Sequence, residues 1–440
     1  MSDALYRAEL LPAIEAELEL NDCPRPRARR GGAVQRWSVR TLVLVAMLMV
    51  FQPLAGLTER FANACAALAR HRPDLGVLPT SYQGFIKALL PLWWNLLERC
   101  SAALRRGIEQ HARAAGHWLR EGWLLFAVDG TRLDCPRTGE NRRAFPRAGR
   151  EKSGPQLLLT ILLHVGTGLV WACRIGSARA SERRHLKQML KLLPPECLLL
   201  ADAGYSGYDM LRQILKGGRH FLVRVGRNLR LLTEQGYHWR REGNEVWLWS
   251  LHAQRSGRPP LKLRLITLEP SSRHPVYLLT DVRSSAALSV RQAGIFYRLR
   301  WGVEVFFRSL KQTLQRRKLL SRTPKTARCE LGMTLLGLWL LGWLSVRAIL
   351  AAGKDPLGLS LALALRQVRR MLLGPGGDGG AGWAGSLGSA LKDAYRRAGR
   401  KASRRTPRKK KQKPAGRPRI RQLTAEQLQK GQALHAIYAA

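Results

Sequence analysis

Two short apolar runs that end on aspartate constrain the fold of this 440-residue chain more than any other feature. WLLFAVD ends on Asp129, and CLLLAD ends on Asp202. Each run has the length and composition of a strand buried on both faces. A predicted hairpin, QLLLTILLHV with LVWACRI, and the helical patterns SERRHLKQMLKLL and YDMLRQILKGG alternate with these runs. The alternation predicts an α/β sheet flanked by helices.

The pattern changes several times along the chain, and the changes predict five segments. From about Gly226 to Asp281 the apolar runs are strand-like only, and Leu261, Leu263 and Leu265 alternate with Lys262 and Arg264 to give one solvent-facing side. The predicted segments are a helical N-terminal domain (1–118), the first part of the α/β core (119–225), an all-β insertion (226–287), the second part of the core (288–352), and a C-terminal region with a helical segment, a glycine-rich linker and a basic tail (353–440).

Local signals place some of the element boundaries. Thr80–Gln83 and Ser289–Gln292 have the pattern of a capping box at a helix start. Gly374–Gly388 has the composition of a flexible linker, and Arg396–Arg421 contains many basic residues and no acidic one, so we expect this segment to be disordered on its own.

The N-terminal region carries a run of arginines before its first apolar helix, from Arg25 to Arg40. A DNA-end-binding domain and a merely structural helical bundle explain it equally well.

The charge of the chain predicts a polyanionic partner. It has 75 Lys and Arg against 30 Asp and Glu, a formal net charge of +45. Nucleic acid is the usual partner of such a chain, because Lys and Arg release counterions when they contact phosphates. An anionic membrane is the competing explanation. The apolar run Leu331–Val346 is short for a membrane span and is closed by Glu330 and Arg347, so we expect a buried core helix and no membrane association.

The distribution of the cysteines and the pattern of the N-terminal residues indicate the cellular compartment of the protein. The seven cysteines are scattered and form no Cys-x-x-Cys pair, which argues against a disulfide framework or a zinc site and for a reducing cytosol. The chain starts with an acidic amphipathic helical pattern, MSDALYRAELLPAIEAELEL, and we expect no signal peptide there.

The segment YRLRWGVEVFFRSLKQTL carries a polar group in helical register. Tyr297, Arg300, Glu304 and Lys311 fall within an arc of roughly 60° on a uniform α-helix. On this segment alone, a solvated polar stripe is the better interpretation.

The two strand-end aspartates change that interpretation. Asp129, Asp202 and Glu304 would repel one another at one site unless cations neutralised them. Carboxylate oxygens suit Mg²⁺ or Mn²⁺, and two such ions about 4 Å apart support phosphodiester displacement. Glu182 could support such a site, although a solvated helix face is the favoured interpretation for it.

These motifs together resemble the DDE transposases of the cut-and-paste insertion-sequence type, the insertion-sequence-four-like group with a Tyr-(2)-Arg-(3)-Glu-(6)-Lys signature. VDGTRL resembles the motif of the first aspartate and LLLADAGYSGYD that of the second, and Tyr297, Arg300, Glu304 and Lys311 match the signature. The resemblance covers roughly residues 122–351. Ala203 departs from the pattern, because many members carry Arg after the second aspartate.

The resemblance implies an RNase H-like core interrupted by the β-rich insertion, with metal-dependent cleavage at transposon ends and strand transfer into target DNA. It implies that Asp129, Asp202 and Glu304 are catalytic and bind Mg²⁺ or Mn²⁺, with two ions expected. The implied partners are double-stranded DNA, as terminal inverted repeats and target, and a second copy of the chain in a homodimer on DNA. A cytoplasmic, nucleoid-associated protein is expected.

Several further residues are DNA-contact candidates. The resemblance assigns phosphate contacts to Tyr297, Arg300 and Lys311, and Arg308 follows on the same basic segment. Arg417 and Arg419 lie in a Gly-Arg-Pro-Arg sequence like the core of an AT-hook, although a general phosphate-binding tail is the favoured interpretation.

Two alternatives remain open at this point. Relatives use a tryptophan of the insertion to stack a base, and Trp247 and Trp249 are candidates, but paired core aromatics are the favoured interpretation. The alternative function is a catalytically inactive DNA-binding protein on the same fold, and the complete set of acids and signature residues favours an active enzyme over it.

Overall fold

The computed structural model describes residues 10–22, 37–53, 56–146, 154–234, 240, 242–269, 275–373, 382–392 and 416–439. The chain forms two compact units, each made of segments that are far apart in the sequence. Unit 1 comprises Met1–Glu121, Gly130–Glu182 and Gly302–Lys392. Unit 2 comprises Gly122–Asp129, Arg183–Trp301 and Asp393–Ala440.

Unit 1 is mainly helical. Its helices are α2 (Leu10–Glu17), α3 (Val39–Phe51), α4 (Leu57–His71), α5 (Tyr82–Leu89), α6 (Trp93–Ala114), α7 (Gly139–Ala144), α12 (Gly302–Arg308), α13 (Pro324–Ala351), α14 (Leu361–Leu373) and α15 (Trp383–Gly388). Its hairpin consists of β2 (Gln156–His164) and β3 (Leu169–Ser177), paired antiparallel as predicted. Helices α6 and α13 both pack on β3, and α12 packs on β2.

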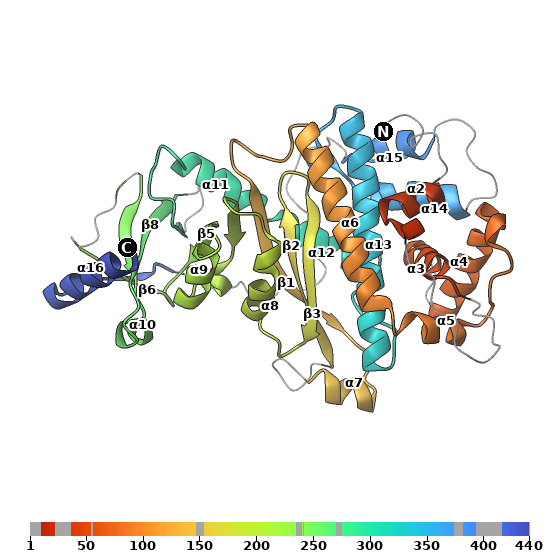
Figure 1. Cartoon of the computed structure of the whole chain (residues 1–440), viewed down its shortest axis with the longest axis horizontal. Helices are drawn as coiled ribbons and strands as arrows, with labels where there is room; N and C mark the ends of the chain where they lie inside the picture. The colour runs from red at the N-terminus through yellow and green to blue at the C-terminus, as the bar shows by residue number, and fades with distance from the viewer. Residues whose placement is uncertain are drawn as a thin grey trace, which may run out of the picture. The chain divides into compact units, whose positions relative to one another are not determined.

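Helix α13 is the centre of unit 1. Among the described helices it is the one long and apolar enough to cross a membrane by length and composition, yet 94% of its most apolar window is buried inside the protein. This burial confirms the predicted core helix at Leu331–Val346. Figure 1 shows α6 and α13 side by side. Two glycines permit this close approach, since a Cβ on Gly107 would lie 2.9 Å from the Trp343 ring and one on Gly332 would lie 2.7 Å from the Trp93 ring.

Unit 2 is built on a mixed sheet. Its strand order is β10-β6-β7-β8-β9-β5-β4-β1, in which β1, β4 and β5 run parallel to one another and β5 runs antiparallel to β9. The strands are β1 (Leu125–Asp134, which continues into unit 1), β4 (Leu198–Ala201), β5 (His220–Val225), β6 (Arg230–Thr233), β7 (Asn244–Leu248), β8 (Leu261–Leu268), β9 (Val276–Thr280) and β10 (Arg419–Gln422). The helices are α8 (Glu182–Met189, which starts at the last residue of a unit 1 segment), α9 (Tyr208–Leu215), α10 (Leu251–Arg255), α11 (Val290–Leu299) and α16 (Ala425–Ala439).

The structure corrects two expectations about the β-rich insertion. It is not made of strands alone, because Ser250 caps the short helix α10 by accepting a hydrogen bond from the Ala253 N–H. The alternation on β8 also fails at Arg264, which is 4% exposed instead of solvent-facing. Its guanidinium donates to the carbonyls of Glu242 and Leu288, and these bonds compensate its burial.

One of the two predicted capping boxes is correct. Ser289 and Gln292 form the reciprocal pair at the start of α11. At α5 the cap is Ser81 and not Thr80, since the Ser81 hydroxyl accepts from the Gly84 N–H.

The C-terminal region is more ordered than its composition predicts. Trp383–Gly388 of the expected linker form α15, with Trp383 and Leu387 buried, and residues 374–381 lie outside the described part. Most of the basic tail, 396–415, also lies outside it. Its last part is not disordered, because β10 pairs parallel to β6 with Ile420 opposite Leu231. Composition alone missed the apolar contribution of this isoleucine.

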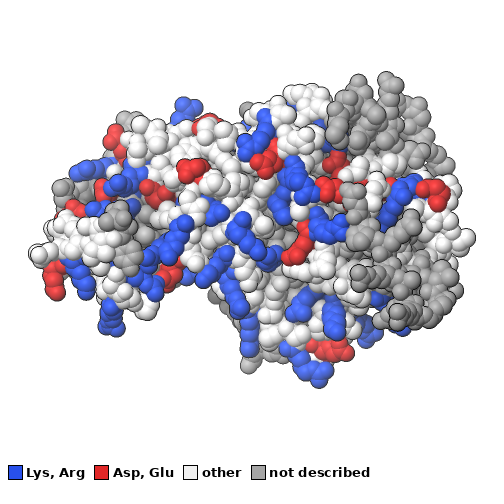
Figure 2. Space-filling model, viewed as in Figure 1, with Lys and Arg blue, Asp and Glu red and all other residues white. Residues whose placement is uncertain are grey.

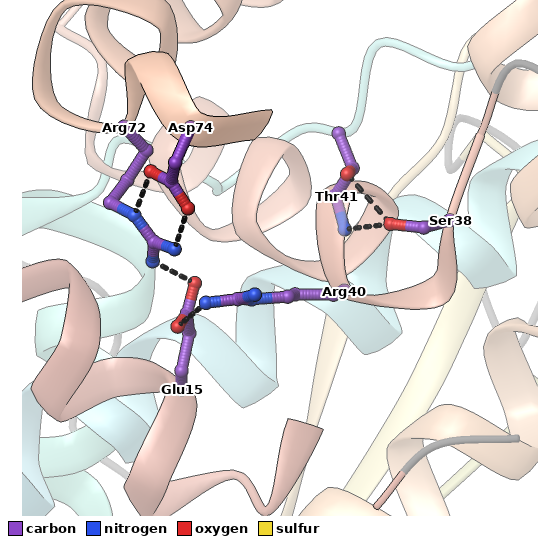
Figure 3. A network of polar contacts seen from close by, with 6 residues as sticks. All are labelled: Glu15, Ser38, Arg40, Thr41, Arg72 and Asp74. Carbon is purple, nitrogen blue, oxygen red and sulfur yellow. Dashed lines mark hydrogen bonds and ion pairs between the residues drawn. The ribbon is translucent and has the colours of Figure 1, made fainter. Parts of the chain in front are cut away.

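The arginine run before α3 is described only at Arg40, because residues 23–36 lie outside the described part of the chain. Arg40 forms an ion pair with Glu15, a carboxylate that is only 3% exposed (Figure 3). Arg72 also pairs with Glu15 and donates from Nε to Asp74 at 2.7 Å. Arg40 therefore has a structural role, since a buried carboxylate requires a cationic partner.

Candidate active site

The two predicted aspartates lie at the same level of two neighbouring parallel strands. In the β1–β4 pair, Ala127 is opposite Leu200. Continued two residues beyond the paired positions, this register would bring the backbone of Asp129 beside that of Asp202, since neighbouring strands lie about 5 Å apart. Asp202 directly follows β4, as predicted, whereas β1 continues beyond Asp129 to Asp134. The prediction that Asp129 ends its strand is therefore wrong, but the pairing of the two strands does not depend on it.

A cation and a phenol connect the two aspartates within unit 2. Arg300 NH1 lies 3.2 Å from Asp129 Oδ2, and the two side chains are only 12% and 18% exposed. The Arg300 guanidinium carbon lies 5.7 Å from the centre of the Tyr297 ring. Burial raises the pKa of Tyr297, and the nearby Asp202 carboxylate raises it further, against the opposing effects of Arg300 and Arg224. The Tyr297 hydroxyl therefore keeps its proton at neutral pH and can donate a hydrogen bond.

The Asp202 carboxylate is held by its own loop. Its Oδ1 accepts a hydrogen bond from the Gly204 N–H at 2.8 Å, which makes Asp202 the cap of a short 3₁₀ turn. Arg183 Nε donates to the Gly204 carbonyl at 2.6 Å and secures the same loop from α8. Both bonds fix the direction of the carboxylate before any ligand binds.

Arg224 is a site residue that the sequence did not single out. The β4–β5 register has Ala201 opposite Val223, so that the next positions, Asp202 and Arg224, are also neighbours. Its charge lowers the pKa of Tyr297, and among the described residues its Nε is buried without a hydrogen-bond partner. The only sequence signal was a single basic residue in an otherwise apolar strand, HFLVRV.

The signature segment is not the uniform helix assumed from its spacing. Helix α11 ends at Leu299 with Arg300 as its C-cap, and α12 starts at Gly302. Lys311 lies in a single π-helical turn, Ser309–Thr313, after α12. The predicted 60° arc of four side chains is therefore wrong, because the arc required one unbroken α-helix.

In unit 1, the second half of the signature is partly buried. Glu304 lies in the first turn of α12 and is half-buried, and Arg308 at the end of α12 is exposed. Lys311 Nζ donates to Thr131 Oγ1 at 2.6 Å.

In unit 2, Trp301 has 53% of its surface exposed, an unusual position for a large aromatic side chain.

Glu182 is not on a simple solvated face. A Cβ at Gly130, the residue after Asp129, would lie 2.5 Å from the Glu182 carboxyl carbon. The Glu182 carboxylate therefore packs against the backbone at Gly130, and a larger residue there would require this side chain to move.

The donor chemistry of the site fits a hard divalent cation, although no group of three or more His, Cys, Asp or Glu side chains in the described residues is arranged to hold a metal. Two neighbouring carboxylates need a positive charge between them. At Asp129 the Arg300 guanidinium supplies that charge in this structure. Asp129 and Asp202 therefore fit Mg²⁺ by ligand type and by their paired position.

Of the remaining candidate residues, the two tryptophans are buried and the two arginines are exposed. Trp247 and Trp249 are 1% and 4% exposed, with their rings 6.4 Å apart, so the core interpretation of these aromatics is confirmed. Arg417 and Arg419 are exposed at the start of the β10 segment.

Comparisons with known proteins agree on one family. Residues 123–340 match the family model described as transposase DDE domain. The chain is 27% identical to the transposase InsG for insertion sequence element IS4 of Escherichia coli K12 over 272 residues, 58% of this chain and 60% of InsG. It is 26% identical to the putative transposase InsZ of the same organism over 126 residues, 27% of this chain and 42% of InsZ. The chain thus spans less than two thirds of either relative.

A solved structure of the piggyBac transposase synaptic complex with hairpin DNA covers 84% of this chain and 78% of its own, at 12% identity. Its TM-score of 0.39 is too low to establish a shared fold.

Proposed function

Because residues 123–340 belong to the transposase DDE domain family, we propose that the protein is a DNA transposase that cuts DNA at transposon ends and joins those ends to target DNA. One observation supports this proposal above the others. Asp129 lies within β1 and Asp202 directly follows the neighbouring parallel strand β4, with Arg300 bound to the first and the charge of the second acting on Tyr297. Sites of α/β sheets are usually built near the carboxyl ends of their parallel strands, which supports a metal-binding role for this pair.

In this proposal Asp129, Asp202 and Glu304 bind Mg²⁺ or Mn²⁺, with two ions in the complete site, on a core of the RNase H-like type. The bound metal would supply an activated water or 3′-hydroxyl and would stabilise the leaving oxygen. The protein's own part is to hold the carboxylates: the Gly204 N–H orients Asp202, and the Arg300 guanidinium holds Asp129 at 3.2 Å.

The neighbouring side chains would bind the DNA backbone. The Tyr297 hydroxyl would donate a hydrogen bond to a phosphate oxygen, since its raised pKa keeps it protonated. Arg300 would turn from Asp129 to a phosphate once metal neutralises the carboxylate. We add Arg224, whose position beside Asp202 supports the same role. Lys311 and Arg308 complete the proposed phosphate contacts.

The proposed partners are duplex DNA, as terminal inverted repeats and as target, and a second copy of the chain in a homodimer on DNA. The net charge of +45 supports a polyanionic partner. Arg417 and Arg419 would add sequence-independent phosphate contacts. A cytoplasmic protein associated with the nucleoid follows from these partners.

The decisive experiment is a cleavage assay with the full chain, Mg²⁺ and a duplex that carries the repeats flanking its own gene. We expect strand cleavage, and we expect Glu304→Gln to reduce its rate by about two orders of magnitude or more, because the change removes a contact to the metal in the transition state. DNA binding measured on the same duplex should persist.

Glu269→Gln is a matched control, because it removes one exposed carboxylate of the same type outside the site. It should cleave like the parent protein. Full cleavage by Glu304→Gln would exclude Glu304 from the mechanism. Duplex binding with no cleavage by the parent protein would favour the inactive DNA-binding alternative.

A further inference from the structure

Unit 2 contains a basic groove between α8 and α9 that adjoins the site described above and shares Arg183 with it. It has a volume of about 720 Å³ and includes the start of α9 and His252 of α10 in its lining. We call it the α8–α9 groove and define it by its six basic side chains: Arg183, Arg184, Lys187, Arg212, Lys216 and Arg258. Figure 2 shows Lys and Arg gathered over α8 and α9 on this face.

The charge of the groove is almost entirely positive. Asp209 is the one carboxylate among its described lining residues, and Arg258 NH1 binds it at 2.8 Å. The other five basic side chains thus share the groove without an acidic lining residue. Arg184, Lys187 and Lys216 are exposed, so they are available to a large ligand from solvent.

The basic side chains form two rows. Arg183 and Lys187 are four residues apart on α8, and Arg212 of α9 is four residues before Lys216, the C-cap of that helix, whose backbone is still helical. Residues four apart stand on the same face of a helix, about 6 Å from one another along its axis. Such rows can contact successive phosphates of a nucleic-acid strand.

The groove provides charge without a surface for base stacking. Tyr208, the one Phe, Tyr or Trp side chain in its described lining, is only 5% exposed, and its hydroxyl donates to the Pro259 carbonyl at 2.6 Å. Proteins that hold single strands stack successive bases on several exposed aromatic rings, whereas the one exposed ring in this lining is the His252 imidazole. Duplex DNA keeps its bases inside and offers phosphates alone to such a surface.

We propose that the α8–α9 groove is a second DNA-binding site, which holds the phosphate backbone of a duplex next to the Asp202 loop. The connection to that loop is direct, because Arg183 of the groove donates to the Gly204 carbonyl and Gly204 donates to the Asp202 carboxylate. This inference rests on the proposed transposase function and adds a binding surface to it. The duplex is either a transposon end or other DNA such as the target.

The test is DNA binding by the full chain with the triple variant Arg184→Gln, Lys187→Gln, Lys216→Gln. Two fluorescent duplexes serve as probes, one with the terminal repeat and one of unrelated sequence, titrated over a range of NaCl concentrations. Each lost phosphate contact lowers the slope of log K against log [salt] by about 0.9, so we expect a slope smaller by about 2 to 3 and roughly tenfold to a hundredfold weaker binding. Equal thermal unfolding of the variant and the parent would show that the fold is retained.

The control variant Lys354→Gln, Arg366→Gln, Arg370→Gln removes the same charge from exposed positions of unit 1 that do not line the groove. The slope of log K against log [salt] for this control variant should remain close to that of the parent protein. If the groove variant loses affinity for the repeat duplex alone, the groove binds the transposon end. If it loses affinity equally for both duplexes, the groove binds DNA of any sequence. An unchanged slope, or an equal loss in the control variant, overturns the groove proposal.

The two proposals fail differently. If the groove variant binds like the parent while Glu304→Gln still abolishes cleavage, the groove proposal fails and the transposase proposal stands. If the parent neither binds nor cleaves duplex DNA, the transposase proposal itself fails.

Discussion

At the scale of single residues, the contact between Arg300 and Asp129 defines the state of the site without DNA. Both side chains are largely buried, so their attraction is screened less than that of a surface pair. A guanidinium at this carboxylate competes with any cation that would bind there. In the proposed site, binding of a metal at Asp129 would therefore be linked to the release of Arg300.

This linkage gives a prediction for Arg300→Gln. Removal of the competing charge should tighten Mn²⁺ binding to the DNA-free protein, on the order of tenfold, because a repulsion between two cations is lost. Isothermal titration with MnCl₂ measures the change. Arg298→Gln removes an equal charge from an exposed position on α11 and should leave the affinity near that of the parent. Equal affinities in the parent and Arg300→Gln would contradict the competition.

Individual residues also show which parts of the candidate site could be predicted from the sequence. Asp129 and Asp202 were singled out because each follows an apolar run, and the strands that carry these runs are parallel neighbours. Arg224 could not be found, because its importance comes from the β4–β5 register and not from its local sequence. Glu304, Lys311 and Arg308 remain predictions as members of a joint site.

At the scale of elements, the patterns of strands and helices were predictable and their irregularities were not. The hairpin β2–β3 and the core helix α13 have strong local patterns. The break between α11 and α12 and the π-helical turn at Lys311 lie within a segment that has uniform helical periodicity. Periodicity reports which residues can share a face, and it does not report where packing interrupts the helix.

The packing of α6 against α13 gives an element-scale prediction. Gly107→Ala should gain about 1 kcal/mol from helix propensity. The new Cβ would lie 2.9 Å from the Trp343 ring, and the indole N–H of Trp343 is held by Glu17, so the ring cannot easily move. Overpacking of about 1–3 kcal/mol should prevail and lower the stability. Urea unfolding measures the free-energy change.

Gly84→Ala is the matched control on α5, where the nearest atom to the new Cβ is 3.6 Å away. It should leave the stability unchanged or raise it by up to about 1 kcal/mol. If Gly107→Ala proves as stable as Gly84→Ala, the close approach does not constrain α6.

At the scale of the whole molecule, segments distant in sequence complete each unit. Strand β10 joins unit 2 from the far end of the chain, where composition predicted disorder. The N–H groups of Arg419 and Leu423 donate to the carbonyls of Leu229 and Thr233. By the alternation of a strand, the N–H of Arg421 also faces β6, and that of Gln422 faces away.

Proline substitutions test this attachment. Arg421→Pro should remove a donor from the β10–β6 ladder and accelerate amide hydrogen exchange in Arg230–Thr233, measured by mass spectrometry. Gln422→Pro should have little effect, because proline is tolerated where the N–H points outward from an edge strand. Arg421→Gln controls for the lost charge. Equal exchange in both proline variants would contradict the parallel pairing.

The pairing of β10 with β6 also has a consequence for biosynthesis. Strand β6 leaves the ribosome long before β10 exists, and until then its outer edge carries unpaired N–H and C=O groups. An open edge of this kind can pair with a strand of another chain. A nascent chain that stalls before residue 419 is thus exposed to aggregation through β6, and completion of the C-terminal segment removes that hazard by occupying the edge.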